Sequence, residues 1–182
     1  NSALYRVSYR GNAPTELANG SNKLGWTERN IRHELEKFHG RVDSKAVDAA
    51  WPSLGHNDRF IRYAARTAIE HQPVSEWRER ALNESNPQAR LTALLALARQ
   101  GEKSDQPALL NQLSRLPLAD MPEAQQLEAH RVLSLCFIRM GRPAPELAKA
   151  FTEAILPYYP AATDALNREF VAMLVYLNAP EV

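Results

Sequence analysis

The 182-residue chain has one cysteine, seven glycines and no long apolar run. The single thiol, Cys136, excludes an internal disulfide and a cluster of cysteine metal ligands. No segment approaches the roughly 18 apolar residues of a membrane-spanning helix, so we expect no membrane insertion. The 22 basic and 21 acidic side chains nearly balance, and this balance gives no argument for a nucleic-acid or membrane-surface partner. The chain begins with Asn1 and has no signal-peptide pattern, which we interpret as a processed protein or a piece of a larger one.

Residues that favour helices are abundant. Ala and Leu supply 50 of the 182 residues, whereas Val and Ile together supply 13. Ala and Leu lose little side-chain freedom in a helix, while β-branched residues favour strands. The 12 prolines fall mostly between segments of helical periodicity, where they end one helix or begin the next. The composition therefore predicts an all-α fold.

The first residues are the exception to this helical pattern. Residues 4–10 alternate apolar and polar side chains, which predicts a short strand. Two interpretations stay open, a poorly ordered terminus or the last strand of a preceding β domain. Residues 12–24 are rich in Asn, Gly, Ser and Pro and are typical of a linker. We therefore assign residues 1–26 to the end of a β domain plus linker, and residues 27–182 to a helical domain.

Within the helical domain the pattern predicts one helix followed by four helix pairs. Thr27 is the expected N-cap of the first helix, which runs to about residue 38. The pairs that follow are expected at residues 43–53 with 57–70, 74–84 with 88–100, 106–115 with 122–140, and 144–156 with 164–177.

The helix pairs recur at similar intervals. The second helices begin near Asp58, Pro87, Pro122 and Asp164, at spacings of 29, 35 and 42 residues. A helical hairpin that repeats every 30–45 residues or so is typical of an α-solenoid. We expect an α-solenoid of about four HEAT-like helix pairs, with a globular helix bundle as the alternative.

The helix that begins at Asp58 carries a motif that resembles the inner helix of HEAT repeats. Asp58 can accept hydrogen bonds from the first free N–H groups, and Ile61 is the aliphatic residue of the motif. Arg62 is expected to pair with Asp58 or with a capping acid of the next repeat. Ala64 and Ala65 allow close approach of neighbouring helices. The later repeats lack the matching arginine, so a regular Asp–Arg ladder is not expected.

Candidate catalytic and cofactor sites are scarce. His33 and Glu34 resemble the start of a zincin helix, but Lys37 stands where that motif needs its second histidine, and His39 lies on another face. The single His-Glu dipeptide also argues against a di-iron helical-repeat hydroxylase. Cys136 is expected to be a buried apolar residue, and no haem-attachment motif or phosphate-binding glycine loop occurs. We expect neither a cofactor nor catalysis.

The remaining candidate site is a basic strip on the inner helices. We place Arg59, Tyr63 and Arg66 on it and extend it to Arg90 and Arg99. HEAT-like DNA glycosylases use a basic concave surface with Trp and Asp, which makes nucleic acid an alternative partner. The nearly neutral charge disfavours that alternative. We interpret the strip as a surface that docks a protein.

Several segments together resemble one family more closely. They are similar to the HEAT-repeat region of large multidomain proteins from planctomycetes and verrucomicrobia, in which a sugar-dehydrogenase-like β-propeller precedes the repeats and a c-type cytochrome follows. The segments that carry the resemblance are residues 3–9, 33–41, 50–52, 54–66, 70–74, 77–81 and 86–89.

The resemblance implies an extracytoplasmic protein in which this chain is a non-catalytic scaffold between redox modules. The propeller's active site and the haem motif lie outside this sequence, so redox activity would belong to other domains. A free-standing protein-docking module is the alternative function, and a nucleic-acid-binding protein or DNA glycosylase is less favoured.

Overall fold

The computed structural model describes residues 4–13 and 24–179, and this part of the chain forms helices and no strands. The predicted all-α fold is confirmed. The α-helices are α1 (Trp26–Glu36), α2 (Ala46–Ala50), α3 (Arg59–Glu70), α4 (Val74–Leu82), α5 (Pro87–Gln100), α6 (Gln106–Ser114), α7 (Glu123–Met140), α8 (Pro145–Ile155) and α9 (Asp164–Leu177). Short 3₁₀ turns lie at Trp51–Ser53, Lys103–Asp105, Leu118–Asp120 and Leu156–Tyr158.

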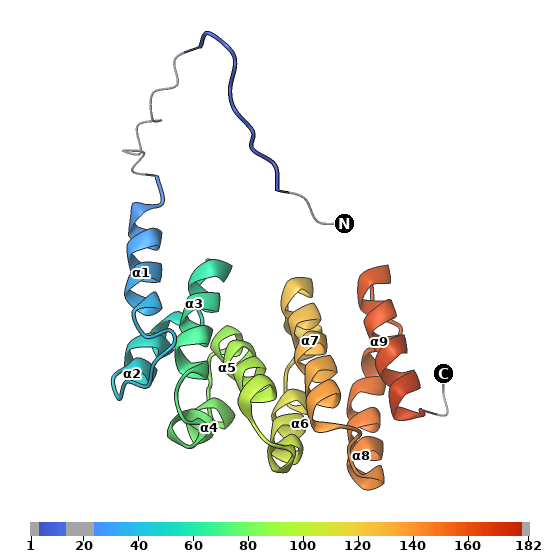
Figure 1. Cartoon of the computed structure of the whole chain (residues 1–182). Coiled ribbons are helices and arrows are strands. Elements are labelled where there is room, and N and C mark those ends of the chain that lie inside the picture. Colours follow the sequence, from blue (N-terminus) through green and yellow to red (C-terminus); the bar gives the residue numbers. More distant parts are fainter. Residues whose placement is uncertain (1–3, 14–23, 180–182) are drawn as a thin grey trace.

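The helices lie in two layers (Figure 1). One layer holds α3, α5, α7 and α9 in chain order, with α1 packed on α3 at its end; the other holds α2, α4, α6 and α8. Each helix of the first layer packs on its hairpin partner in the second layer and on the next helix of its own layer. Helices α3 and α9 therefore lie far apart, separated by α5 and α7 (Figure 1).

Local capping explains where the helices of the first layer begin. The Asp58 carboxylate accepts a hydrogen bond from Phe60 N at 2.7 Å. Asn86 Oδ1 accepts one from Ala89 N at 2.9 Å at the start of α5, where Pro87 takes the first helical position. These contacts satisfy N–H groups that have no partner within the helix. The predicted starts of α3 and α5 are thereby confirmed.

Helix α1 begins differently from the prediction. Its first residue is Trp26, and Gly25 precedes it with φ 66°, a left-handed conformation that glycine adopts without steric cost. Thr27 is therefore inside the helix and is not its N-cap.

The core runs continuously through both layers. Ile61, Ala64 and Ala65 are buried at 1%, 1% and 0% exposure, as the motif on α3 predicts. Leu174 on α9 is fully buried at the other end of the same core. Small residues on α3 let α1, α2 and α5 pack against it closely.

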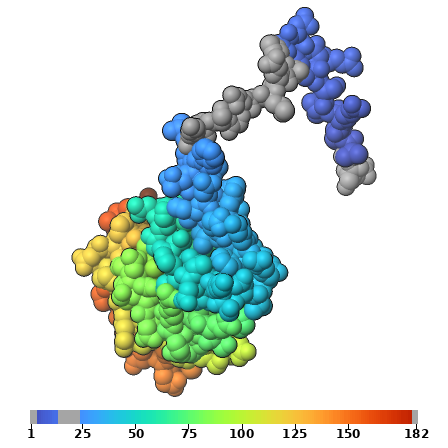
Figure 2. Space-filling view, turned by 90° about the vertical axis from the view of Figure 1, so that its left-hand side faces the viewer, coloured from blue at the N-terminus to red at the C-terminus, as the bar shows by residue number. Residues whose placement is uncertain are grey.

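The N-terminal segment does not form the predicted strand. Residues 4–10 have neither helix nor strand conformation, and Tyr5 and Val7 are 83% and 95% exposed. A strand requires a partner strand for its backbone hydrogen bonds, and residues 4–13 lie apart from the helical body (Figure 2). Most of the predicted linker, at residues 14–23, lies outside the described residues. The assignment of residues 1–26 to a preceding β domain stays a prediction.

Among the helices of the described residues, none has both the length and the apolar character to cross a bilayer.

Candidate functional site

An open hollow lies across the first layer of helices. It has a volume of about 650 Å³ and receives residues from α3, α5, α7 and α9. We call it the inner hollow. Its lining residues are Arg66, Leu95, Arg99, Ala124, Leu127, Glu128, Arg131, Ser134, Leu135, Ile138 and Glu169. Because four helices of the first layer contribute to it, no single helix pair forms this surface alone.

A shared carboxylate joins α3 to α5 at the wall of the hollow. Glu70 Oε1 accepts a hydrogen bond from Arg66 Nη1 and also lies 2.8 Å from Arg99 Nε. The Glu70 side chain is only 7% exposed, so this contact is largely shielded from solvent. The Arg66 guanidinium stacks over the Tyr63 ring, with its carbon 5.1 Å from the ring centre. The structure thus brings together three of the five residues predicted for the basic strip.

The predicted strip needs two corrections. Arg66 is not exposed: it is 8% accessible, because Glu70 one turn later and Tyr63 one turn earlier hold its side chain against the helix. Arg59, Tyr63 and Arg90 do not line the hollow. Arg59 stacks over Phe60, with 4.8 Å from guanidinium carbon to ring centre, and Arg90 Nε donates to Glu84 O at 2.6 Å.

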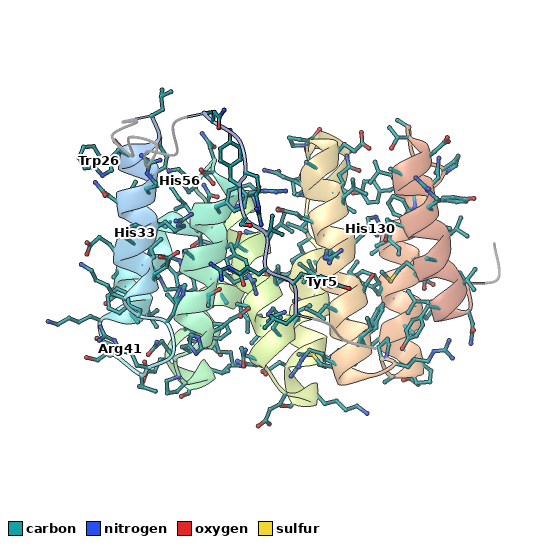
Figure 3. All side chains as sticks on the ribbon, turned by 45° about the horizontal axis from the view of Figure 1, so that its top comes forward. Tyr5, Trp26, His33, Arg41, His56 and His130 are labelled. Atoms are coloured by element: carbon teal, nitrogen blue, oxygen red, sulfur yellow. The ribbon has the colours of Figure 1, made fainter. Side chains whose placement is uncertain are left out.

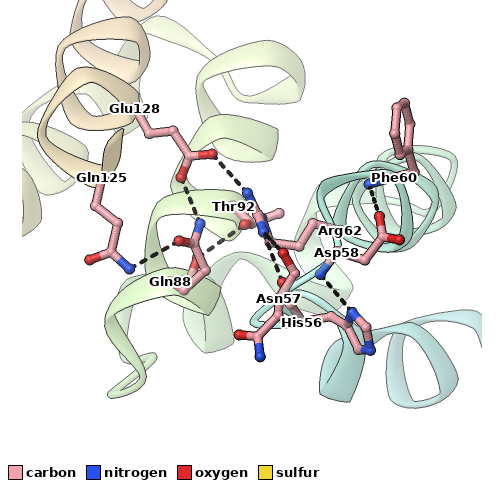
Figure 4. Close-up of polar contacts among 9 residues, drawn as sticks. All are labelled: His56, Asn57, Asp58, Phe60, Arg62, Gln88, Thr92, Gln125 and Glu128. Atoms are coloured by element: carbon pink, nitrogen blue, oxygen red, sulfur yellow. Dashed lines mark hydrogen bonds and ion pairs between the residues drawn. The ribbon is translucent and has the colours of Figure 1, made fainter. Parts of the chain in front are cut away.

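Arg62 also has other partners than predicted. Its guanidinium donates to His56 O at 2.8 Å and to Asn57 O at 3.0 Å, and it pairs with Glu128 of α7 at 3.2 Å (Figure 4). Asp58 is engaged in capping α3 and does not pair with Arg62. The expected partner, Asp58 or an acid of the next repeat, is wrong because the long Arg62 side chain reaches past α5 to α7.

Gln88 of α5 completes this polar network. Its side chain donates to Glu128 Oε2 at 2.6 Å and accepts from Gln125 Nε2 at 3.1 Å (Figure 4). Both carboxylate oxygens of Glu128 therefore have partners within the protein, one on α3 and one on α5. The network fixes α3, α5 and α7 relative to one another at the edge of the inner hollow.

Sequence reasoning missed the contribution of α7 to the hollow. Glu128, Arg131, Leu135 and Ile138 are spaced by three, four and three residues, which places them on one face of the helix. This periodicity was available in the sequence. Ile138, the last residue of this face, is 79% exposed.

The histidines do not converge on a metal site. His33 and His56 lie at the α1–α3 end of the molecule, and His130 lies on α7 (Figure 3). His39 and His71 have ring centres 6.1 Å apart, but His39 Nε2 lies 2.9 Å from Ala64 O and no third ligand joins them. Across residues 4–13 and 24–179, no group of three or more His, Cys, Asp or Glu side chains is arranged to hold a metal ion.

Two titratable groups of α7, His130 and Cys136, are buried. His130 on α7 is 2% exposed, and its ring meets the Phe170 ring edge-on at 4.4 Å between centres. Burial lowers the pKa of His130, and the negative charge of Glu169 acts in the opposite direction. Burial raises the pKa of the Cys136 thiol to about 11. Neither environment activates its group for chemistry at neutral pH.

The fold and the hollow define an all-helical protein with a recess that mixes arginines, carboxylates and aliphatic side chains. No protein-family model matches the chain, and comparison with curated proteins and with solved structures gave no match either.

Proposed function

We propose that the chain is a non-catalytic α-solenoid of HEAT-like helix pairs that docks a protein partner in its inner hollow. The observation that carries the proposal is the composition of the hollow: four inner helices in chain order each contribute to one open surface. Stacked helical hairpins give a stiff, extended body with a long binding face, which suits a spacer or docking element.

The chemistry of the hollow favours protein over nucleic acid. Glu128 and Glu169 line it beside the arginines, and Leu95 and Ile138 add aliphatic surface. A nucleic-acid backbone presents one negative charge per nucleotide, so carboxylates along its path would repel it. Protein segments carry discrete charges between apolar groups and fit such a mixed surface better.

The proposal extends to a larger protein through the family resemblance. In that setting the chain would link an N-terminal propeller dehydrogenase to a C-terminal cytochrome in an extracytoplasmic protein, and its partners would be these adjacent domains. A free-standing docking module is the second candidate. Coding sequence upstream of Asn1 and a Cys-x-x-Cys-His motif downstream of Val182 would identify the first arrangement; their absence from the gene would identify the second.

Titration of the neighbouring domains against this chain tests docking directly. We expect saturable binding that weakens about tenfold or more when Ile138→Glu places a charge in the hollow. The matched control is Val42→Glu, since Val42 is also a β-branched aliphatic residue, is 69% exposed and is not part of the hollow. Equal binding by the parent and Ile138→Glu proteins would refute docking through the hollow.

A further inference from the structure

At one side of the inner hollow, two arginines share a single carboxylate. Glu70 is one carboxylate shared by two arginines, since both Arg66 and Arg99 approach its Oε1 atom. The Arg99 side chain remains 45% exposed, whereas Glu70 lies beneath it at 7%. One positive charge at this junction is therefore uncompensated and faces the hollow.

A second cation stands on the neighbouring helix. Arg131 of α7 is exposed and forms neither a hydrogen bond nor an ion pair with any described residue. The nearest carboxylate on its own helix, Glu128, is already bound to Arg62 and Gln88. Glu169 of α9 is the remaining carboxylate of the lining, and among the described residues it forms no ion pair with Arg99 or Arg131. The α5–α7 part of the hollow thus presents two arginines with capacity for an external carboxylate.

Aliphatic and aromatic surface adjoins these arginines. Ile138, 79% exposed, follows Arg131 by two helical turns on α7. The hollow continues there into a groove of about 370 Å³ between α7 and α9, which shares Ser134 and Ile138 with it. The groove is otherwise lined by Phe137, Ala172, Met173 and Tyr176. Exposed apolar surface beside arginines that remain accessible is the composition of protein-binding hot spots.

We infer that the hollow binds an acidic segment of a partner protein in which carboxylate side chains alternate with bulky apolar ones. Arg99 and Arg131 would bind the carboxylates, and Ile138 with the α7–α9 groove would bury the apolar groups. Bidentate guanidinium–carboxylate pairing gives the orientation, and apolar burial gives the affinity. This inference rests on the proposed docking function and adds the chemistry of the partner.

Other occupants fit less well. A basic segment would leave Arg99 and Arg131 facing like charge, which is unfavourable at short range. A second copy of the chain would bring the same arginines of two hollows together in a symmetric contact.

Selection from a random peptide library displayed on phage, with the purified chain as bait, tests the inference. We expect enriched peptides rich in Asp or Glu next to Leu, Ile or Phe. Synthetic copies should bind the Arg131→Glu and Ile138→Ser proteins about tenfold or more weakly, and weaken as salt is raised. Arg131 forms no hydrogen bond or ion pair with the described residues, and Ile138 is not a core side chain. Both variants should therefore fold. Arg115→Glu, an exposed arginine after α6 outside the hollow, is the matched control.

A second selection on the Arg131→Glu protein sharpens the test, because the preference should shift from acidic to basic peptides. Peptides that depend on Ile138 but are neutral or basic, or that ignore Arg131→Glu, would overturn the acidic partner and leave docking in the hollow intact. A selection with no enriched peptides, or with peptides unaffected by both hollow substitutions, would overturn the docking function as well.

Discussion

Arg62 connects parts of the chain that are distant in sequence. It donates to the carbonyls of His56 and Asn57 just before α3 and pairs with Glu128 on α7, 66 residues away. Its side chain is 16% exposed, so these bonds are partly shielded from water. Charge-assisted hydrogen bonds in such positions contribute more than surface ion pairs do.

We predict that Arg62→Ala lowers the free energy of unfolding by about 1–3 kcal/mol, because two carbonyls and the Glu128 carboxylate lose a donor. Chemical denaturation of the purified variant measures this. Arg59→Ala, an exposed arginine on the same helix, should change stability by about 0.5 kcal/mol or less. Equal effects of the two substitutions would contradict the role of the network.

The burial of His130 predicts that stability depends on pH. Both of its ring nitrogens are buried without a hydrogen-bond partner in the described structure. Of the helices that pack against α7, α6 has no titratable group, and α5 has Arg90 and Arg99. Helix α9 has Asp164, Arg168, Glu169 and Tyr176, of which Glu169 favours the charged ring. Burial outweighs Glu169 and lowers the pKa of His130 from 6.5.

Because the unfolded chain then binds the proton more readily, the contribution of His130 is fully present above pH 6.5 or so and is lost as pH falls towards the lower folded-state pKa. We predict that His130→Leu reduces the loss of stability on acidification across this window. Urea unfolding at a series of pH values measures the slope. His33→Leu, at an exposed position, should keep the slope of the parent. If the free energy of unfolding of the His130→Leu protein changes with pH as steeply as that of the parent, His130 is not the cause of the pH dependence.

At the residue scale the sequence predicts local roles better than distant partners. The Asp58 cap and the burial of Ala64 and Ala65 follow from contacts within one or two turns, and both are confirmed. The partner of Arg62 depends on how α7 lies relative to α3, which no local pattern contains. Arg66 was predicted to be exposed, although Glu70 four residues later indicated an ion pair along the helix.

At the scale of elements, proline and cap positions make helix boundaries predictable. The segment predicted as one helix at 43–53 instead divides into α2 and the 3₁₀ turn Trp51–Ser53. Pro52 explains the division, because it has no N–H to donate to the carbonyl four residues earlier. The α1 start was missed because a glycine in left-handed conformation leaves no side-chain cap to recognise in the sequence.

Packing between neighbouring helices gives a prediction at this scale. Ala65 is fully buried on α3, where α1, α2 and α5 pack. We predict that Ala65→Leu lowers the free energy of unfolding by about 1–3 kcal/mol, because the added atoms overpack the contact. Thermal and chemical unfolding measure the change. Ala49→Leu, at an exposed position of α2, provides the matched control and should have little effect. An unchanged melting temperature for Ala65→Leu would contradict the close packing of helices at Ala65.

For the whole molecule we predict that the isolated chain binds no haem, holds no transition metal and oxidises no sugar. Haem attachment of the c type needs two thiols and a histidine in one short segment, and Cys136 is the only thiol. A stable zinc or iron site needs three or four converging ligands. Metal analysis and a visible spectrum of untagged, dialysed protein test this. A stoichiometric metal or a Soret band would redirect attention to His33, Glu34 and His39.

The connection from Arg62 to Glu128 has a consequence for how such a chain can change over time. In a simple array each unit touches only its neighbours, so a unit can be duplicated or deleted without disturbing the others. Here Arg62 of α3 pairs with Glu128 of α7 across the intervening hairpin of α4 and α5, and Gln88 of that hairpin binds the same carboxylate. Removing the hairpin would remove Gln88 and change how α3 and α7 lie relative to each other. The helix pairs of this protein are therefore not equivalent, and the contacts between α3 and α7 limit how many pairs can lie between them.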